Sequence, residues 1–162
     1  TFIMPGQKIR QQANHRKLSV IEREVRGRNV LVVDDSIVRG NVSRHIVKLL
    51  RDHGAKAVYF ASASPALRWP DLYGIDLPTR EEYVAYNRTE DQIREVIGAD
   101  VLIYQDLPDL IEAVMREGDG KLKFKRMHTA YFDGNYATGD VDEKVLAGVE
   151  GFRKEQKSAY LG

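Results

Sequence analysis

Two adjacent carboxylates, Asp34 and Asp35, stand directly before a segment of small and polar residues. Carboxylate oxygens accept hydrogen bonds from hydroxyl groups and are hard ligands of the kind that Mg²⁺ prefers. Gly40 allows a close backbone approach or a positive φ. Three residues of the segment add side-chain donors: Ser36, Asn41 and Ser43. Backbone N–H groups at the start of a helix favour a phosphate. The combination predicts a site for a ribose 5-phosphate.

A strand before the carboxylates and a helix after them must position this chemistry. The apolar run Asn29–Val33 predicts a buried strand, and open α/β sheets bind ligands at the carboxyl ends of their strands. Apolar residues recur at helical spacing over Asn41–His53, and Gly54 stands where a C-terminal cap belongs. Because neighbouring strand residues point to opposite faces, the two carboxylates reach one ligand only if the strand has already ended.

Strand and helix signals alternate along the rest of the chain. Short apolar runs predict two further strands, Ala57–Ala61 and Val101–Tyr104. Amphipathic spacing predicts three further helices: Glu90–Ile97, Leu107–Met115 and Asp142–Lys157. Two segments are turn-rich: Ser62–Pro78 is typical of a loop, and Tyr131–Tyr136 of an edge strand or hairpin. This alternation favours an α/β fold in which helices flank a parallel sheet.

The N-terminal 1–28 segment differs from the rest, because basic residues are spread over it with little hydrophobic periodicity. Such a segment is either a solvated arm or a mobile basic lid over an anionic substrate. We expect an α/β core over 29–141 and a C-terminal helix over 142–162, with no linker between domains.

Composition excludes several classes of function. The 162 residues are 43% apolar and 30% charged with a net charge of +1, so bulk attraction to nucleic acid or membranes is not expected. No apolar run reaches the roughly 20 residues that span a bilayer, and no signal peptide is visible, so we expect a cytoplasmic protein. The absence of cysteine excludes disulfides, thiolate metal sites and cysteine nucleophiles within these residues. The four histidines show no metal-ligand spacing and are expected at the surface or at helix ends: His15, His45, His53 and His128.

The segment from Asp34 to Ser43 resembles the phosphoribosyl-pyrophosphate (PRPP) motif of the type I phosphoribosyltransferases. Four segments in order resemble one family among them, the amidophosphoribosyltransferases: Thr1–Gln7, Arg16–Leu18, Asp34–Gly40 and Tyr73–Pro78. The resemblance covers essentially the whole chain and implies the C-terminal, phosphoribosyltransferase part of such an enzyme. Three strands are fewer than a sheet of this family has, so the others are expected upstream of Thr1.

The resemblance implies a reaction and a role for each motif residue. Ammonia derived from glutamine is transferred to C1 of PRPP, giving 5-phosphoribosylamine and pyrophosphate in the first committed step of de novo purine biosynthesis. Asp34 and Asp35 are implied to hold the ribose hydroxyls and to organise Mg²⁺. The implied substrate-binding residues that follow them are Ser36, Ile37, Val38, Arg39, Gly40, Asn41, Val42 and Ser43. The implied catalytic residue is Lys17, which a closing loop would bring to the departing pyrophosphate.

The family resemblance also implies partners outside these residues. Ammonia would come from an N-terminal glutaminase domain with a cysteine nucleophile, and some family members have an iron–sulfur cluster. Because this chain has no cysteine, it holds neither, and we expect the isolated chain to be nearly inactive. Purine nucleotides are implied feedback inhibitors, and the parent enzyme is implied to be a homo-oligomer.

The same residues are also compatible with three other classes of protein. Val30–Asp35 also resembles the first strand of a response-regulator receiver domain, but Asp76 follows a proline-rich loop and Asp106 comes too late to be its phospho-acceptor. A non-catalytic regulator that senses PRPP or nucleotides could contain the same motif, although the basic arm favours the enzyme. A nucleobase salvage enzyme would need a base-recognition region that is not identified. For Arg39 the sequence leaves phosphate binding and solvent exposure equally open.

Overall fold

A parallel three-stranded sheet forms the base of the molecule. The computed structural model describes residues 19–74, 79–116 and 127–161. Within them the strand order is β1-β2-β3, with strands Asn29–Asp34 (β1), Ala57–Ser62 (β2) and Val101–Tyr104 (β3). Both strand pairs are parallel. The predicted α/β class with a parallel sheet is therefore confirmed.

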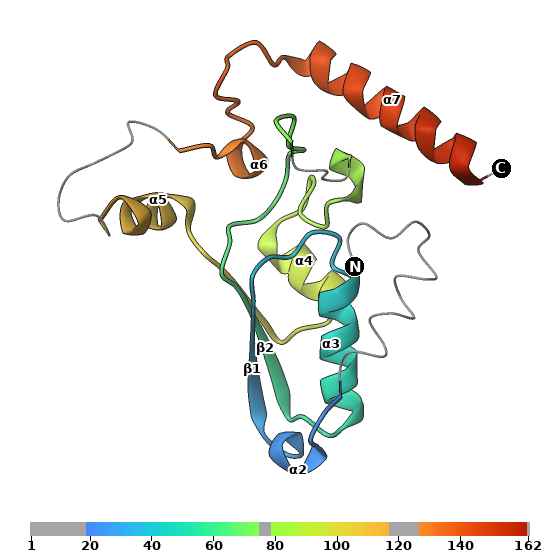
Figure 1. Cartoon of the computed structure of the whole chain (residues 1–162). Coiled ribbons are helices and arrows are strands. Elements are labelled where there is room, and N and C mark those ends of the chain that lie inside the picture. Colours follow the sequence, from blue (N-terminus) through green and yellow to red (C-terminus); the bar gives the residue numbers. More distant parts are fainter. Residues whose placement is uncertain (1–18, 75–78, 117–126, 162) are drawn as a thin grey trace.

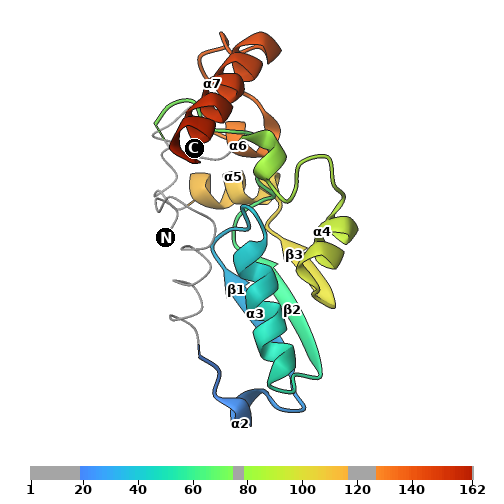
Figure 2. The same ribbon diagram turned by 90° about the vertical axis from the view of Figure 1, so that its right-hand side faces the viewer.

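Helices connect and flank these strands (Figure 1). Their bounds are Glu22–Val25 (α2), Asn41–Asp52 (α3), Glu90–Ile97 (α4), Leu107–Arg116 (α5), Ala130–Asp133 (α6) and Glu143–Leu161 (α7), with a 3-10 turn at Arg80–Glu82 (η1). α7 lies at the end of the molecule opposite α2 in both views (Figures 1 and 2). No helix in the described part of the chain is long and apolar enough to cross a membrane.

Glycines end the two helices that cover the sheet, at the positions that the sequence indicated. Gly54 follows α3 with φ +85°, and Gly98 ends α4 with φ +78°. Both angles lie in the left-handed region, which costs glycine no steric penalty. At its other end α4 begins with a capping box, in which the Thr89 side chain accepts from the Gln92 N–H and the Gln92 side chain accepts from the Thr89 N–H.

The core lies on one face of the sheet, between the strands and the helices α3 and α4 (Figures 1 and 2). Val58 and Phe60 of β2 are fully buried there, against Val47 of α3 and Ile93 and Ile97 of α4. These residues recur every second position in the strand and at helical spacing in the helices, as burial of a single face requires. This packing fixes the sheet against both helices.

The prediction that Asn29–Val33 is buried is wrong for one face. Burial alternates along β1, and Leu31 and Val33 are 56% and 68% exposed. The strand register aligns them with Val101 and Ile103 of β3, which are 40% and 48% exposed. A continuous apolar run is typical of a strand covered on both faces. Here the described helices α3 and α4 cover the other face.

The prediction of an edge strand or hairpin at Tyr131–Tyr136 is also wrong. This segment begins within the short helix α6, which Gly134 ends with φ +74°. Its polar groups bond to a loop instead of a strand: the Tyr131 carbonyl accepts from the N–H groups of Arg68 and Trp69, and the Tyr136 hydroxyl donates to the Pro70 carbonyl at 2.7 Å. A second apolar cluster forms there, with Leu146 of α7 buried beside Tyr136.

Candidate functional site

The three strands end level with one another at the carboxyl edge of the sheet. The register pairs Asp34 with Ser62 and Ser62 with Tyr104. Beyond the strands, the Ala63 N–H donates to the Asp34 carbonyl at 2.9 Å and the Gln105 N–H to the Ser62 carbonyl at 3.1 Å. Burial raises the pKa of the Tyr104 phenol to about 12, so this side chain is neutral near pH 7. Ligand sites of open α/β sheets lie at this edge.

Asp34 and Asp35 lie on either side of the end of β1. Asp34 is the last strand residue and is half-buried, whereas Asp35 is exposed. The Asp35 N–H donates to Asp34 Oδ1 at 3.0 Å, and the Ser36 hydroxyl donates to Asp35 Oδ1 at 2.9 Å. Because regular strand geometry stops between them, the two side chains are not bound to opposite faces. These hydrogen bonds engage Oδ1 of each carboxylate.

The turn from Asp35 to Gly40, here called the motif turn, leads into α3. Ile37 is 1% exposed and anchors the turn in the core. Gly40 has φ +73° and is the N-cap residue of α3. A Cβ at this position would lie 3.1 Å from Val84 Cγ2, so Gly40 combines left-handed backbone with close packing.

The N-terminus of α3 has no side-chain cap, in contrast to α4. Its N-cap residue, Gly40, has no side chain, and its carbonyl accepts the first intrahelical bond from the Arg44 N–H at 2.9 Å. The first N–H groups of a helix require an acceptor, and a phosphate can supply it. This end of α3 also has no acidic residue in its first turn to compete with an anion.

The predicted side-chain donors are placed unequally. Ser43 is only 3% exposed, and the Asn41 Oδ1 atom accepts from the Arg44 guanidinium at 3.2 Å. Ser36 donates to Asp35. The backbone of the α3 N-terminus, more than these side chains, is therefore suited to an anion.

Arg39 is partly buried and pairs with a carboxylate of the protein. Its side chain is 26% exposed, and its Nε lies 3.6 Å from Glu82 Oε1. That Nε atom is shielded from solvent and has no hydrogen-bond partner among the described residues. The sequence offered no signal for the pairing with Glu82, which is far along the chain.

The implied catalytic residue Lys17 lies outside the described residues. So do Phe2, Ile3 and Met4 of the resemblance segment Thr1–Gln7 and Asp76 of the segment Tyr73–Pro78. At the carboxyl end of β2 the Ser62 hydroxyl donates to the Ser64 carbonyl at 2.7 Å. The Tyr73 hydroxyl lies 2.6 Å from Thr138 Oγ1.

The carboxylate pair fits a Mg²⁺ ion that takes most of its ligands from substrate and water. Among the described residues no group of three or more histidine, aspartate or glutamate side chains comes together, so no all-protein metal cage is formed there. Mg²⁺ typically binds one or two carboxylates together with substrate phosphates and waters. Asp34 and Asp35 offer that donor set beside the motif turn.

The histidines are placed for structural roles where they are described. His53 Nδ1 lies 2.8 Å from the Leu49 carbonyl at the end of α3, as expected of a capping residue. His128 is half-buried and directly precedes Thr129, the N-cap residue of α6. Its ring packs edge-to-face against Tyr73 and Tyr131, with ring centroids 4.9 Å away in each case.

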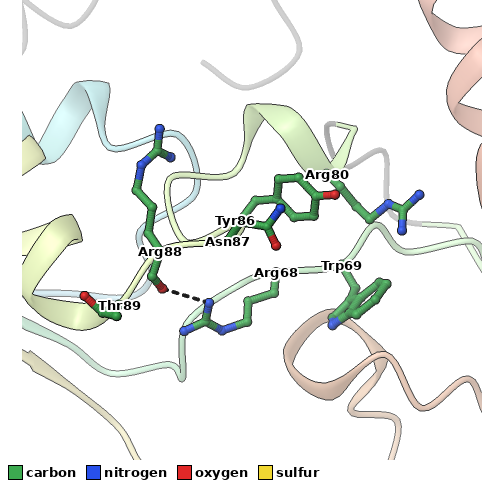
Figure 3. A pocket seen from close by; sticks show the side chains of 7 residues that line it. All are labelled: Arg68, Trp69, Arg80, Tyr86, Asn87, Arg88 and Thr89. Carbon is green, nitrogen blue, oxygen red and sulfur yellow. Dashed lines mark hydrogen bonds between the residues drawn. The ribbon is translucent and has the colours of Figure 1, made fainter.

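A cavity of about 500 Å³ is lined by residues outside the motif (Figure 3). Its lining residues are Arg68, Trp69, Arg80, Tyr86, Asn87, Arg88 and Thr89, none of which belongs to the motif. The three arginines donate to protein acceptors. Arg68 donates to the carbonyls of Ala85 and Arg88, Arg88 to the Val84 carbonyl, and Arg80 to two glutamates. Arginines engaged in this way brace the surrounding loops.

Comparison with known proteins identifies the family. The chain is 51% identical over 159 residues to the amidophosphoribosyltransferase of Pseudomonas aeruginosa and 47% identical over 159 residues to that of Escherichia coli. Each alignment covers 98% of this chain. The chain belongs to the amidophosphoribosyltransferase family. No protein-family model matches it.

Solved structures of this family share the fold. A glutamine PRPP amidotransferase from Bacillus subtilis, complexed with ADP and GMP, matches with a TM-score of 0.69 at 39% identity over 91% of this chain. An allosteric regulatory enzyme of purine biosynthesis matches with a TM-score of 0.66 at 36% identity over 93% of this chain. The chain spans only 31% of the length of the curated relatives and 32% of these two structures. It therefore corresponds to one part of the amidophosphoribosyltransferases.

Proposed function

We propose that this chain forms the phosphoribosyltransferase part of an enzyme that transfers glutamine-derived ammonia to C1 of PRPP, yielding 5-phosphoribosylamine and pyrophosphate. The observation that supports this most directly is the uncapped N-terminus of α3 beside Asp34 and Asp35, in a chain 51% identical to a named amidophosphoribosyltransferase. At one strand end this geometry provides N–H donors for a phosphate and carboxylate acceptors for the ribose hydroxyls.

The proposed mechanism relies on positioning and electrostatics. The α3 N-terminus holds the 5-phosphate, and Asp34 and Asp35 accept hydrogen bonds from the ribose hydroxyls, so that C1 is held in place. The ammonia lone pair forms the new C1–N bond while the C1–O bond to pyrophosphate breaks, and the ammonium product loses one proton. Lys17 stabilises the growing negative charge on pyrophosphate. Mg²⁺, held by Asp34 and Asp35, would supply further positive charge to the pyrophosphate and ribose oxygens.

The proposal extends to partners and to the arrangement of the chain. A glutaminase domain outside these residues would supply ammonia, and residues 1–28 would form the lid, 29–141 the core and 142–162 a C-terminal helix. The exclusion of water by the lid would protect the reaction centre from hydrolysis. We also propose a cytoplasmic location, since a highly charged substrate such as PRPP does not cross bilayers unaided.

Purine nucleotides are proposed as inhibitors, and a homo-oligomer as the working assembly. The structural relative from Bacillus subtilis was solved with ADP and GMP bound, which supports nucleotide regulation in this family. A nucleoside monophosphate shares the ribose 5-phosphate of PRPP and could occupy the same motif turn and α3 N-terminus.

Substitution of the carboxylates tests the proposed site. Asp34→Asn and Asp35→Asn in the complete gene product should each weaken PRPP binding or turnover about 10- to 100-fold, the loss of a hydrogen bond to a charged group. Pyrophosphate release with ammonia and PRPP measures this, and calorimetry measures PRPP affinity.

Asp52→Asn is the matched control, because Asp52 is an exposed carboxylate at the end of α3 that pairs with Lys48. Unchanged affinity and turnover in both site variants would refute the assignment. PRPP binding without pyrophosphate release by the unaltered protein would instead indicate a sensor.

A further inference from the structure

One short segment, Thr79–Val84, contacts three successive residues of the motif turn. The Val84 N–H donates to the Val38 carbonyl at 2.8 Å. Glu82 Oε1 lies 3.6 Å from the Nε atom of Arg39. The Val84 Cγ2 atom lies 3.1 Å from the position that a Cβ of Gly40 would take. The backbone of the turn is thus held from outside the motif by a segment that the sequence motif does not include.

Glu82 is itself held in a defined position within this segment. Its Oε2 atom accepts from the Thr79 N–H at 3.3 Å, and the Thr79 side chain and Glu82 form a reciprocal capping box. The other oxygen, Oε1, is therefore the one that faces Arg39. A carboxylate oriented by a cap presents its charge with little rotamer entropy left to lose.

The pair between Glu82 and Arg39 is partly removed from water. The side chains are 29% and 26% exposed, and Arg39 Nε is shielded with no hydrogen-bond partner among the described residues. A shielded cationic group needs a nearby opposite charge, since desolvation without one is costly. Within the described residues Glu82 supplies that charge to a side chain that belongs to the motif turn.

The segment is anchored on its far side as well. The Arg80 guanidinium donates to Glu143 and Glu150 of α7, and the Arg80 backbone N–H donates to Glu150 at 2.9 Å. Arg80 is only 9% exposed. Glu82 therefore projects from a rigid support, and a movement of the motif turn would have to break contacts on both sides.

We propose that Glu82 is a positioning residue for substrate binding: through Arg39 it holds the motif turn in the conformation that directs the first N–H groups of α3 at the 5-phosphate. This inference rests on the proposed function, because it takes PRPP as the ligand. Glu82 touches no reacting atom in this scheme. Its loss should therefore affect the binding of PRPP and not the chemical step.

Glu82→Gln in the complete gene product tests the proposal. The amide oxygen of glutamine can still accept from the Thr79 N–H, so the variant removes chiefly the charge that faces Arg39. The KM for PRPP should rise about fivefold, with kcat changed less than about twofold, as expected for a partly exposed ion pair that acts on ground-state binding. Glu81→Gln is the matched control, since Glu81 lies in the same 3-10 turn and pairs with Lys154 of α7 instead.

A double-mutant cycle with Arg39→Gln shows whether the effect passes through Arg39. Arg39→Gln should raise the KM for PRPP by a similar factor, and the double variant should be no worse than either single variant. If Glu82→Gln fails to fold, Glu82→Asp takes its place, because the shorter side chain retains the charge but withdraws it from Arg39.

Two results would overturn the role of Glu82: an unchanged KM for PRPP, or effects of the two substitutions that multiply. A fall in kcat at unchanged KM would also contradict it. Failure of the unaltered protein to release pyrophosphate from PRPP would refute the proposed function instead, and the two failures are thereby distinguished.

Discussion

Gly40 in the motif turn is constrained both by its backbone conformation and by close packing against Val84. Its φ of +73° lies in the left-handed region, where a side chain costs about 1–2 kcal/mol. Its Cα faces Val84 so closely that a Cβ would lie 3.1 Å from the Val84 side chain. As the N-cap residue of α3, it also leaves the helix N-terminus open to an anion.

Gly40→Ala should lower the free energy of unfolding by more than the backbone penalty of about 1–2 kcal/mol and should weaken PRPP binding. Gly139→Ala is the matched control, because Gly139 has φ +72° but nothing lies within 4 Å of the added Cβ. Chemical denaturation and calorimetric titration with PRPP measure the two effects. Equal losses of stability in both variants would show that the contact with Val84 contributes nothing.

The proposed role of Lys17 concerns a residue outside the described part of the chain. If a closing loop brings its ammonium group to the pyrophosphate, Lys17→Ala should lower ammonia-dependent kcat about 100-fold, because the interaction forms as charge develops in the transition state. Pyrophosphate release at saturating PRPP is the measurement. Lys8→Ala removes the same charge from the same basic segment and should have little effect, and intact turnover in Lys17→Ala would exclude the lid role.

At the scale of elements, Arg80 joins the 3-10 turn η1 to the helix α7. Its guanidinium bonds to Glu143 at 2.7 and 2.9 Å and to Glu150 at 3.0 Å, and lies over the Trp69 ring, 5.5 Å from its centroid. Hydrogen bonds from Arg80 hold the pKa of Glu143 below its usual range. Burial opposes ionisation of Glu150, but the side-chain and backbone bonds from Arg80 outweigh it and lower that pKa as well.

Because both carboxyl pKa values are lowered, the contact between α7 and Arg80 should weaken as the pH falls. A carboxyl group with a lowered folded pKa stabilises the folded state above its unfolded pKa, here 4.5. That stabilisation should be complete near neutral pH and should be lost as the pH falls below 4.5 through the lowered folded values. Hydrogen exchange of the α7 amides measured against pH should show the loss.

Arg80→Met is the corresponding substitution, since it retains much of the side-chain volume. It should speed α7 exchange near pH 7 roughly tenfold, because the largely buried pair between Arg80 and Glu150 is broken, and should flatten the acid-dependent step. Glu81→Gln, which removes an exposed pair with Lys154, is the control and should leave the step intact. An unaltered pH profile in Arg80→Met would show that Arg80 does not dock α7.

In the part of the molecule that the structure describes, one face of the sheet is apolar and exposed to solvent. Four apolar side chains on this face are 40% to 68% exposed: Leu31 and Val33 of β1, and Val101 and Ile103 of β3. The strand register aligns the two pairs across β2. An apolar patch of this kind marks an interaction surface. The chain spans only 31% of its relatives' length, and we propose that a part of the enzyme outside these residues covers this face.

The 162-residue chain by itself should therefore self-associate through the sheet. Leu31→Thr together with Val33→Thr should reduce that association at least several-fold while retaining the fold, because both side chains are exposed and threonine favours strands. Sedimentation velocity over a range of concentrations is the measurement. Val96→Thr on α4, where the valine is 40% exposed, is the control away from this face, and equal association in all three proteins would refute the prediction.

The limits of the sequence-based predictions follow from the range of the interactions involved. The bounds of α3 and α4 were predicted closely, because apolar spacing and the following glycines are local signals. The segment Tyr131–Tyr136 was mistaken for an edge strand or hairpin, because its bonds outside α6 go to Arg68, Trp69 and Pro70, far away in the sequence. Burial of both faces of β1 was predicted wrongly, because an apolar run does not reveal which neighbours are present to cover it.

Local residue patterns were sufficient to predict the parallel α/β architecture, the strand that ends at the carboxylate pair, and the glycine-containing turn that leads into α3. Each of these depends on residues that are adjacent or within a helical turn of one another. The pairing of Arg39 with Glu82 and the link that Arg80 makes to α7 became visible in the folded chain alone. These contacts join residues about 40 to 70 positions apart, and packing, which no local pattern encodes, brings them together.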